Sequence, residues 1–214
     1  MIVKKVLLIT AMFMATSAWA YNELDLMKFK TLNACAGCDL SGANLTGTDL
    51  NGANLTGANL NGANLIRANL SGADLNGANL RYTELSTADL SNTNLSKADL
   101  SNANLSEADL SNANLTGADL SRANLIRADL NGANLIRADL NGANLIRANL
   151  NEADLNGANL IKANLSGADL RQANLHQADL SDTDLTTSNL KNVKLDNAIF
   201  CRTKMPWGKI NDGC

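Results

Sequence analysis

Two cysteines three residues apart and a single histidine are the side chains of this chain that are best suited to chemistry. Cys35 and Cys38 form a C-x-x-C pair, and His176 is the only histidine among 214 residues. A redox pair needs an exposed thiol of low pKa, and a zinc site needs two further ligands close by. The residues around the pair supply neither, and His176 has no evident cysteine or serine partner. The sequence therefore favours no redox, zinc or nucleophilic site here.

The remainder of the chain carries no phosphate-binding loop, nucleophile motif or cluster of metal ligands. We therefore expect no catalytic residue, no bound metal and no cofactor, and we do not expect an enzyme. The net charge of -3 is too small to imply nucleic acid or an anionic membrane as a partner.

The first twenty residues differ in kind from the rest. Lys4 and Lys5 precede an apolar run, and a small-x-small cleavage site ends at Ala20. This layout is typical of a secretory signal peptide, and the run is too short to span a bilayer. We expect cleavage before Tyr21, a mature chain without a transmembrane segment, and a periplasmic or extracellular destination. Removal of the two lysines changes the formal charge from -3 to -5.

Leucine occurs at every fifth position from Leu40 to Leu195, thirty-two times without a break, and Phe200 takes the next place. Alanine stands two residues before the leucine in twenty-five repeats, and Asp or Asn stands directly before it in thirty. Five residues turn an α-helix by about 140°, and on a strand an odd step changes face, so neither structure gathers the leucines. The same bend must recur in every repeat, which winds the chain into a solenoid. Pairs such as Asn131-Gly132 provide the turn chemistry.

The tandem A(D/N)LXX pattern, as in Ala138-Asp139-Leu140, resembles the pentapeptide-repeat family, and the C-x-x-C-D-L start resembles its secreted members. The resemblance implies an all-β fold, a right-handed quadrilateral β-helix with four pentapeptides per coil. About eight coils at the ~4.8 Å strand spacing would form a rod of about 40 Å. The expected organisation is a signal peptide (1–20), an N-terminal cap (21–37), the repeat array (38–200) and a C-terminal cap (201–214).

The two ends are expected to close the array. Leu24, Met27 and either Phe29 or Leu32 are available to cover the first coil. The tail after residue 200 lacks the leucine pattern and carries the only proline, so we interpret it as a cover that leaves the repeat register.

The cysteines lie only at the two ends, and a rod of this length keeps the pairs too far apart to bond with each other. This leaves Cys35–Cys38 and Cys201–Cys214, which an exported protein can keep oxidised. Cys35 and Cys38 also occupy the leucine and alanine registers, so two buried thiols filling the first coil are an alternative.

With twenty residues per coil, side chains twenty positions apart stack into columns. Asp89, Asp109 and Asp129 would form an acidic column, and Asp99, Asp119 and Asp139 would form another on the opposite side. The simpler interpretation is that the Asp and Asn side chains bond the local backbone at each corner. Ile-Arg pairs would also stack, and with the first acidic column they make up the candidate interaction surface: Ile126, Arg127, Ile146, Arg147, Arg137, Asp89, Asp109 and Asp129.

We expect an exported, non-enzymatic scaffold that binds a protein or surface partner through its rod faces. The family resemblance offers an alternative, since its quinolone-resistance members imitate duplex DNA and bind topoisomerases. The signal peptide opposes that alternative, and so does a charge of about -5 over about 40 Å, because duplex DNA carries one charge per ~1.7 Å. The sequence leaves a homodimer open.

Overall fold

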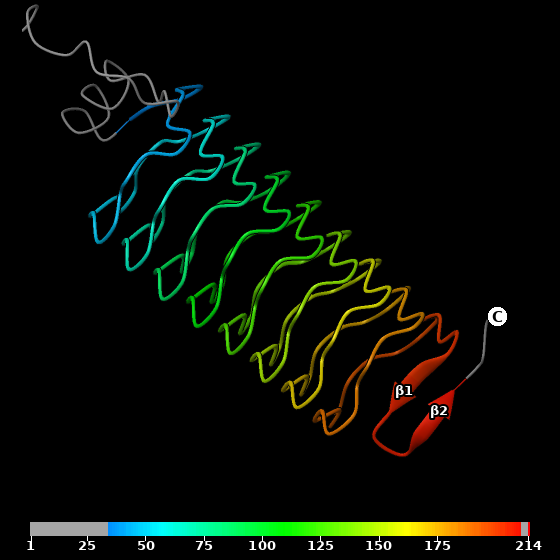
Figure 1. The fold of residues 1–214 in the computed structure, drawn as a ribbon. Coiled ribbons are helices and arrows are strands. Elements are labelled where there is room, and N and C mark those ends of the chain that lie inside the picture. The colour runs from blue at the N-terminus through cyan, green and yellow to red at the C-terminus, as the bar shows by residue number, and fades with distance from the viewer. Residues whose placement is uncertain (1–33, 211–213) are drawn as a thin grey trace, which may run out of the picture.

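The computed structural model describes residues 34–210 and residue 214. The predicted signal peptide (1–20) and the proposed cap residues Leu24, Met27, Phe29 and Leu32 lie outside the described residues. From Ala34 onward the chain bends once in every pentapeptide, and the bends wind it into a four-sided solenoid whose coils stack along one axis (Figure 1).

One coil takes twenty residues, as the parallel backbone bridges show. Each residue at the Asp/Asn position pairs with the residue twenty positions later, from Ala34 with Asn54 to Asp184 with Lys204. Four pentapeptides therefore complete a turn, which the period of five could not establish by itself.

Backbone hydrogen bonds join each coil to the next in a repeating pattern. The Leu120 N–H donates to the Asp139 carbonyl at 2.6 Å, and the Asp139 N–H donates back to the Ala118 carbonyl at 2.9 Å. One residue of the upper coil thus bonds two residues of the lower coil on each face. Every inner coil needs a neighbour on both sides to satisfy its backbone groups.

The corners are two-residue turns in which the second residue has a left-handed backbone. Gly132 has φ of 63°, and Arg127, at the same place in its repeat, has φ of 57°. The expected turns are present, but the structure places many non-glycine residues in this conformation. The Asp or Asn before the leucine supports the turn, since the Asn131 N–H donates to Asp129 Oδ1 at 3.0 Å. The simpler interpretation of the Asp and Asn side chains, as local backbone acceptors, is confirmed.

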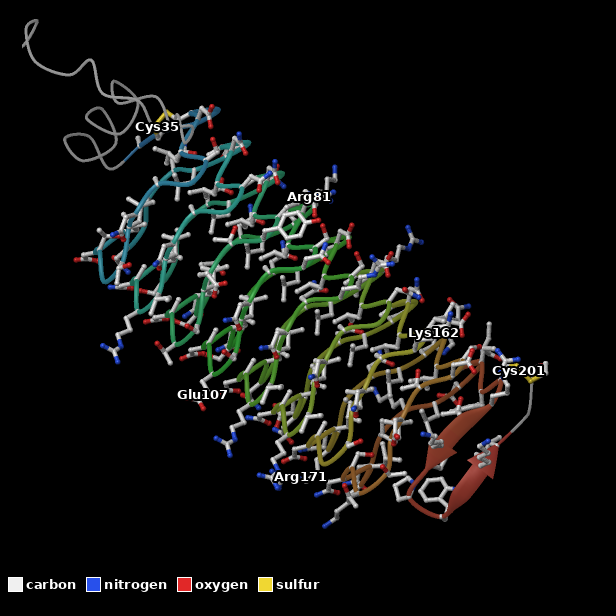
Figure 2. All side chains as sticks on the ribbon, viewed as in Figure 1. Cys35, Arg81, Glu107, Lys162, Arg171 and Cys201 are labelled. Atoms are coloured by element: carbon white, nitrogen blue, oxygen red, sulfur yellow. A yellow bond between two sulfur atoms is a disulfide. The ribbon has the colours of Figure 1, made fainter. Side chains whose placement is uncertain are left out.

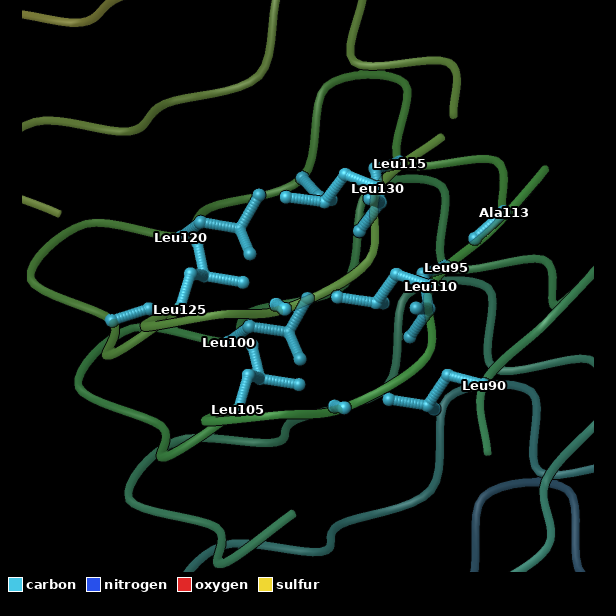
Figure 3. Close-up of a cluster of buried hydrophobic side chains, with 14 of the residues drawn as sticks. Leu90, Leu95, Leu100, Leu105, Leu110, Ala113, Leu115, Leu120, Leu125 and Leu130 are labelled. Carbon is cyan, nitrogen blue, oxygen red and sulfur yellow. The ribbon is translucent and has the colours of Figure 1, made fainter. Parts of the chain in front are cut away.

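Leucine and alanine fill the interior as the pattern predicts. Leu120 is 0% exposed and Ala123 is 1% exposed, and Figure 3 shows the leucines of successive coils lying above one another. Thr83, Thr93 and Thr183 replace alanine and are also buried, and the hydroxyl bonds the backbone: Thr183 Oγ1 donates to the Leu160 carbonyl at 2.7 Å. The core is a narrow leucine column that runs along the rod.

The C-terminal segment keeps the repeat register for one pentapeptide longer than expected. Strand β1 (Thr203–Met205) buries Thr203 in the alanine position and Met205 in the leucine position, and Lys204 bridges Asp184. The expectation that the tail leaves the register after residue 200 is therefore wrong there, because methionine and threonine substitute for leucine and alanine. Strand β2 (Gly208–Ile210) then pairs antiparallel with β1.

No helix within residues 34–210 or at residue 214 is long and apolar enough to cross a membrane.

Candidate interaction surface

The predicted isoleucine–arginine strip forms on one corner of the rod. The Arg127 N–H donates to the Ile146 carbonyl at 3.0 Å, so the two Ile-Arg turns lie in adjacent coils. Both isoleucines are half-buried, whereas Arg127 and Arg147 are exposed. Arg127 also reaches the coil before it, where its Nη1 atom lies 3.3 Å from Glu107 Oε1. An apolar strip with a basic edge results.

Arg137 belongs to another corner. Its N–H donates to the Asn156 carbonyl at 2.9 Å, and the preceding Gly117 N–H donates to the Ile136 carbonyl. The structure therefore does not bring Arg137 together with the strip, in agreement with its expected place on the opposite side.

The two acidic columns also form, and each is an uninterrupted run of three aspartates. Asp109 bridges both Asp89 and Asp129, and on the second column Asp119 bridges Asp99 and Asp139. Elsewhere in these columns an asparagine commonly separates the acids and donates to them, as Asn149 Nδ2 does to Asp129 Oδ1 at 2.9 Å. Within each run no such amide intervenes. The carboxylates therefore stack with like charges opposite each other, which is unfavourable in a sheet.

A polar groove of about 320 Å³ accompanies the second acidic column. Arg81 stands near one end, where its Nη1 atom lies 3.5 Å from Asp99 Oδ2 and its guanidinium lies over the ring of Tyr82, 5.6 Å from the centroid. The hydrogen bond with Tyr82 and the charge of Asp99 raise the pKa of Arg81. The groove is lined by Arg81, Ser101, Asn102, Asp119, Ser121, Arg122, Asp139, Asn141 and Asn159.

Sequence reasoning found the acidic column of this groove but missed its two arginines. The signal was present, because 81, 101, 121 and 141 are spaced by twenty and share one corner. The arginines did not stand out because neighbouring coils place serine, asparagine or glycine at the same positions.

Two of the ion pairs between coils lie near the C-terminal end. The guanidinium of Arg202 donates to both carboxylate oxygens of Asp182 at 2.6 Å, and Lys204 Nζ lies 3.2 Å from Asp184 Oδ2. The hydrogen bond from Arg202 lowers the pKa of Asp182. The overall cationic character of this end, visible in the sequence, is thus partly compensated by aspartates one coil below.

The cysteines, which are the candidates for redox or metal chemistry, form two disulfides. Cys35 bonds Cys38 and Cys201 bonds Cys214, with Cα atoms 5.2 Å and 4.9 Å apart, so all four cysteines are disulfide-bonded. The second pair was predicted, and the first pair was left open with buried thiols as the alternative. Within the part of the chain that the structure describes, no three His, Cys, Asp or Glu residues gather into a group that could hold a metal ion. Figure 2 shows the two disulfides at opposite ends of the solenoid.

Comparisons with known proteins agree on one repeat type. The family model for pentapeptide repeats matches eight copies, over residues 35–72, 68–106, 103–142, 138–177 and 168–205. The solved structure of HetL, a pentapeptide repeat protein involved in heterocyst differentiation regulation from the cyanobacterium Nostoc sp. strain PCC 7120, is 30% identical; the alignment covers 86% of this chain and 97% of HetL, with a TM-score of 0.35.

Two further solved structures are similar. QnrB1, a plasmid-mediated fluoroquinolone resistance protein, is 24% identical over 73% of this chain and 88% of its own, with a TM-score of 0.41. A pentapeptide repeat protein from the thylakoid lumen of Arabidopsis thaliana is 31% identical; the alignment covers 53% of this chain and 72% of the Arabidopsis chain, with a TM-score of 0.22. No curated protein matches the chain.

Proposed function

Because the chain belongs to the pentapeptide-repeat family, whose members fold as right-handed quadrilateral β-helices, we propose that it is an exported, non-enzymatic scaffold. Its array of about eight coils binds a protein or surface partner through the faces of the rod. The proposal assigns the chain a binding surface and no reaction.

The Ile-Arg strip is the observation that carries this proposal. Most outward positions of the rod hold short polar side chains that bond their own turn, as Asp129 does with Asn131. Ile126 and Ile146 instead place two branched apolar side chains in adjacent coils, next to the exposed Arg127 and Arg147. Apolar area bordered by arginine is the composition that protein interfaces favour. The strip therefore offers a partner both buried area and charge.

A capture experiment with a charge-reversed strip tests the binding face. The double variant Arg127→Glu with Arg147→Glu is used as bait beside the unchanged protein, against envelope and culture-fluid proteins. The matched control reverses two cations on another corner, Lys97→Glu with Arg137→Glu. A partner held by the strip is lost with the first variant and kept with the second. A partner that survives both variants, or the recovery of none, contradicts the strip as the binding face.

Export is tested separately by fractionation and by N-terminal sequencing. The proposal expects a chain that begins at Tyr21 in the periplasm or outside the cell. An uncleaved chain in the cytoplasm contradicts export and favours the topoisomerase-binding alternative. A supercoiling assay with the purified protein then tests that alternative.

A further inference from the structure

Among residues 34–210 and 214, the last coil of the rod differs from the coils below it because its upper edge has no backbone partner on three faces. Strand β1 is bonded below by the bridge from Lys204 to Asp184 and above by β2, so β2 lies where a next coil would begin. Figure 1 shows this hairpin at the red end of the solenoid. The remaining faces of the last coil run through residues 188–200.

The face at Val193–Leu195 has hydrogen-bonding groups in position for one more strand. In the inner coils the leucine N–H and the alanine-position carbonyl bond a single residue of the next coil. The Leu185 N–H donates to the Lys204 carbonyl at 2.7 Å, and the Lys204 N–H donates to the Thr183 carbonyl at 2.9 Å. Among residues 34–210 and 214, nothing takes the corresponding place above the Leu195 N–H and the Val193 carbonyl.

The core is also incompletely covered at this end. Inner leucines are 0% exposed, whereas Leu195, Val193, Ala198 and Phe200 are only partly buried. A strand laid on this edge would cover apolar surface and satisfy backbone groups together. Both gains drive the addition of an extended segment to an open sheet edge.

The charge at this edge indicates which kind of extended segment would bind there. Thirty of the thirty-two outward positions before the leucines hold Asp or Asn, but Lys194 occupies the one on this face. Lys194 is exposed, as are Lys191 in the preceding turn and Lys209 in β2. Against them stands Asp196, so this end has an excess of positive charge among the described residues.

The molecule contains a precedent for the pairing that follows. Lys204 stacks directly above Asp184 across two coils and pairs with it through Nζ and Oδ2 at 3.2 Å. An acid directly above Lys194 would form the same pair with the charges exchanged. Opposite charges that face each other across strands stabilise pairing, and like charges oppose it.

From this geometry we infer that the Val193–Leu195 edge binds an extended segment of a partner protein with the pattern apolar–acidic–apolar. The acidic residue lies over Lys194, donates its N–H to the Val193 carbonyl and accepts from the Leu195 N–H. The two apolar residues lie over the partly exposed core. A second copy docking through the same end would bring together two ends that both carry an excess of positive charge, which disfavours it. This edge is separate from the Ile-Arg strip, and binding here does not depend on the proposed function of the rod faces.

Two synthetic peptides and one charge swap test the inference on the full chain. The probes are capped octapeptides, one alternating valine with aspartate and one alternating valine with lysine. We expect the aspartate peptide to bind about fivefold more tightly than the lysine peptide, and Lys194→Glu to reverse this preference. Slower hydrogen exchange of the Leu195 amide locates the bound peptide, and the Leu120 amide is the internal reference.

The controls separate this edge from other sites. The strip variant Arg127→Glu with Arg147→Glu is expected to bind the aspartate peptide as the unchanged protein does. Equal binding of both peptides, an unchanged preference in Lys194→Glu, or protection that appears away from Leu195 overturns the inference. Protection of the Leu195 amide that grows with protein concentration in the absence of peptide also overturns it, and assigns the edge to a second copy.

Discussion

The inner coils and the last coil have the same repeat but different numbers of neighbours. Leu120, in the middle of the rod, is fully buried, and its N–H bonds the coil above. Leu195, at the same place in its repeat, is only partly buried, and no described residue accepts its N–H. A pentapeptide coil therefore owes its stability to contacts above and below it, as expected for a one-dimensional repeat array. The end coil needs additional devices, which here are a hairpin, a disulfide and two ion pairs.

The largest expected effect comes from removing a leucine side chain at the two places. Leu120→Ala should lower the free energy of unfolding by about 2–5 kcal/mol, because the narrow core cannot close around the cavity. Leu195→Ala should cost less, about 1–2 kcal/mol, since part of its surface is already in contact with water. Urea unfolding of both variants measures the difference. Equal losses would show that the end coil is packed as tightly as the inner coils.

The second effect concerns the disulfide at the C-terminal end. Cys201 and Cys214 are thirteen residues apart, and a loop of this size corresponds to about 3 kcal/mol in the chain-entropy model. In Cys201→Ser with Cys214→Ser we expect the amide of Lys204 to exchange faster, while the amide of Leu120 stays protected. The matched control, Cys35→Ser with Cys38→Ser, removes a disulfide with a sequence separation of three and should cost less, about 2 kcal/mol, with no change at Lys204. Faster exchange at Leu120 in the first variant would mean that the rod opens as one unit.

The sequence predicted the inner coils better than the ends, and the reason is physical. Inside the rod each position has one environment, so a leucine such as Leu120 repeats wherever that environment repeats. At the C-terminal end Met205 and Thr203 fill the same two sites with other residue types, and the pattern no longer reveals the register. The coil of twenty residues was predictable only through the family resemblance, because a period of five fixes the bend but not the number of sides.

The candidate interaction surface likewise has features that the sequence predicts and features that it does not. Columns such as Asp89, Asp109 and Asp129 could be predicted once the coil length was assumed, since they depend on spacing alone. The ion pair between Arg202 and Asp182 could not, because it depends on which rotamers two long side chains adopt between coils. The open edge at Leu195 was also not predictable, since it depends on β2 pairing antiparallel with β1 where a further coil would begin.

A smaller effect concerns the corner turns, and it tests whether a turn in an inner coil and a turn near the end of the rod are equally strained. Thr87 and Thr187 both have a left-handed backbone, with φ of 57° and 60°, and both hydroxyls bond the preceding carbonyl, at 2.7 Å and 2.6 Å. Thr87→Gly and Thr187→Gly should each raise the free energy of unfolding by about 1 kcal/mol, because glycine has no Cβ to strain this conformation. The alanine variants keep the Cβ and should change little. Unequal gains in urea unfolding would show that neighbouring coils also set the strain of a turn.

The smallest effect is electrostatic and compares two aspartates. Asp169 has its pKa lowered by the hydrogen bond from Arg171 in its own turn, whereas Asp182 has its pKa lowered by Arg202 in the next coil. Both folded pKa values lie below the ordinary value of 3.8, so each pair stabilises the fold above that pH. The contribution is lost as the pH falls through the folded pKa.

Opening the end coil should therefore separate the two aspartates. In Cys201→Ser with Cys214→Ser, carboxyl NMR titration should show the pKa of Asp182 rising toward 3.8 while that of Asp169 stays low, because only the first depends on the position of the last coil. Arg202→Gln should raise the pKa of Asp182 in the same way with the disulfide intact. If the pKa of Asp182 stays low without the disulfide, the hairpin and the ion pairs are sufficient to hold the last coil in place.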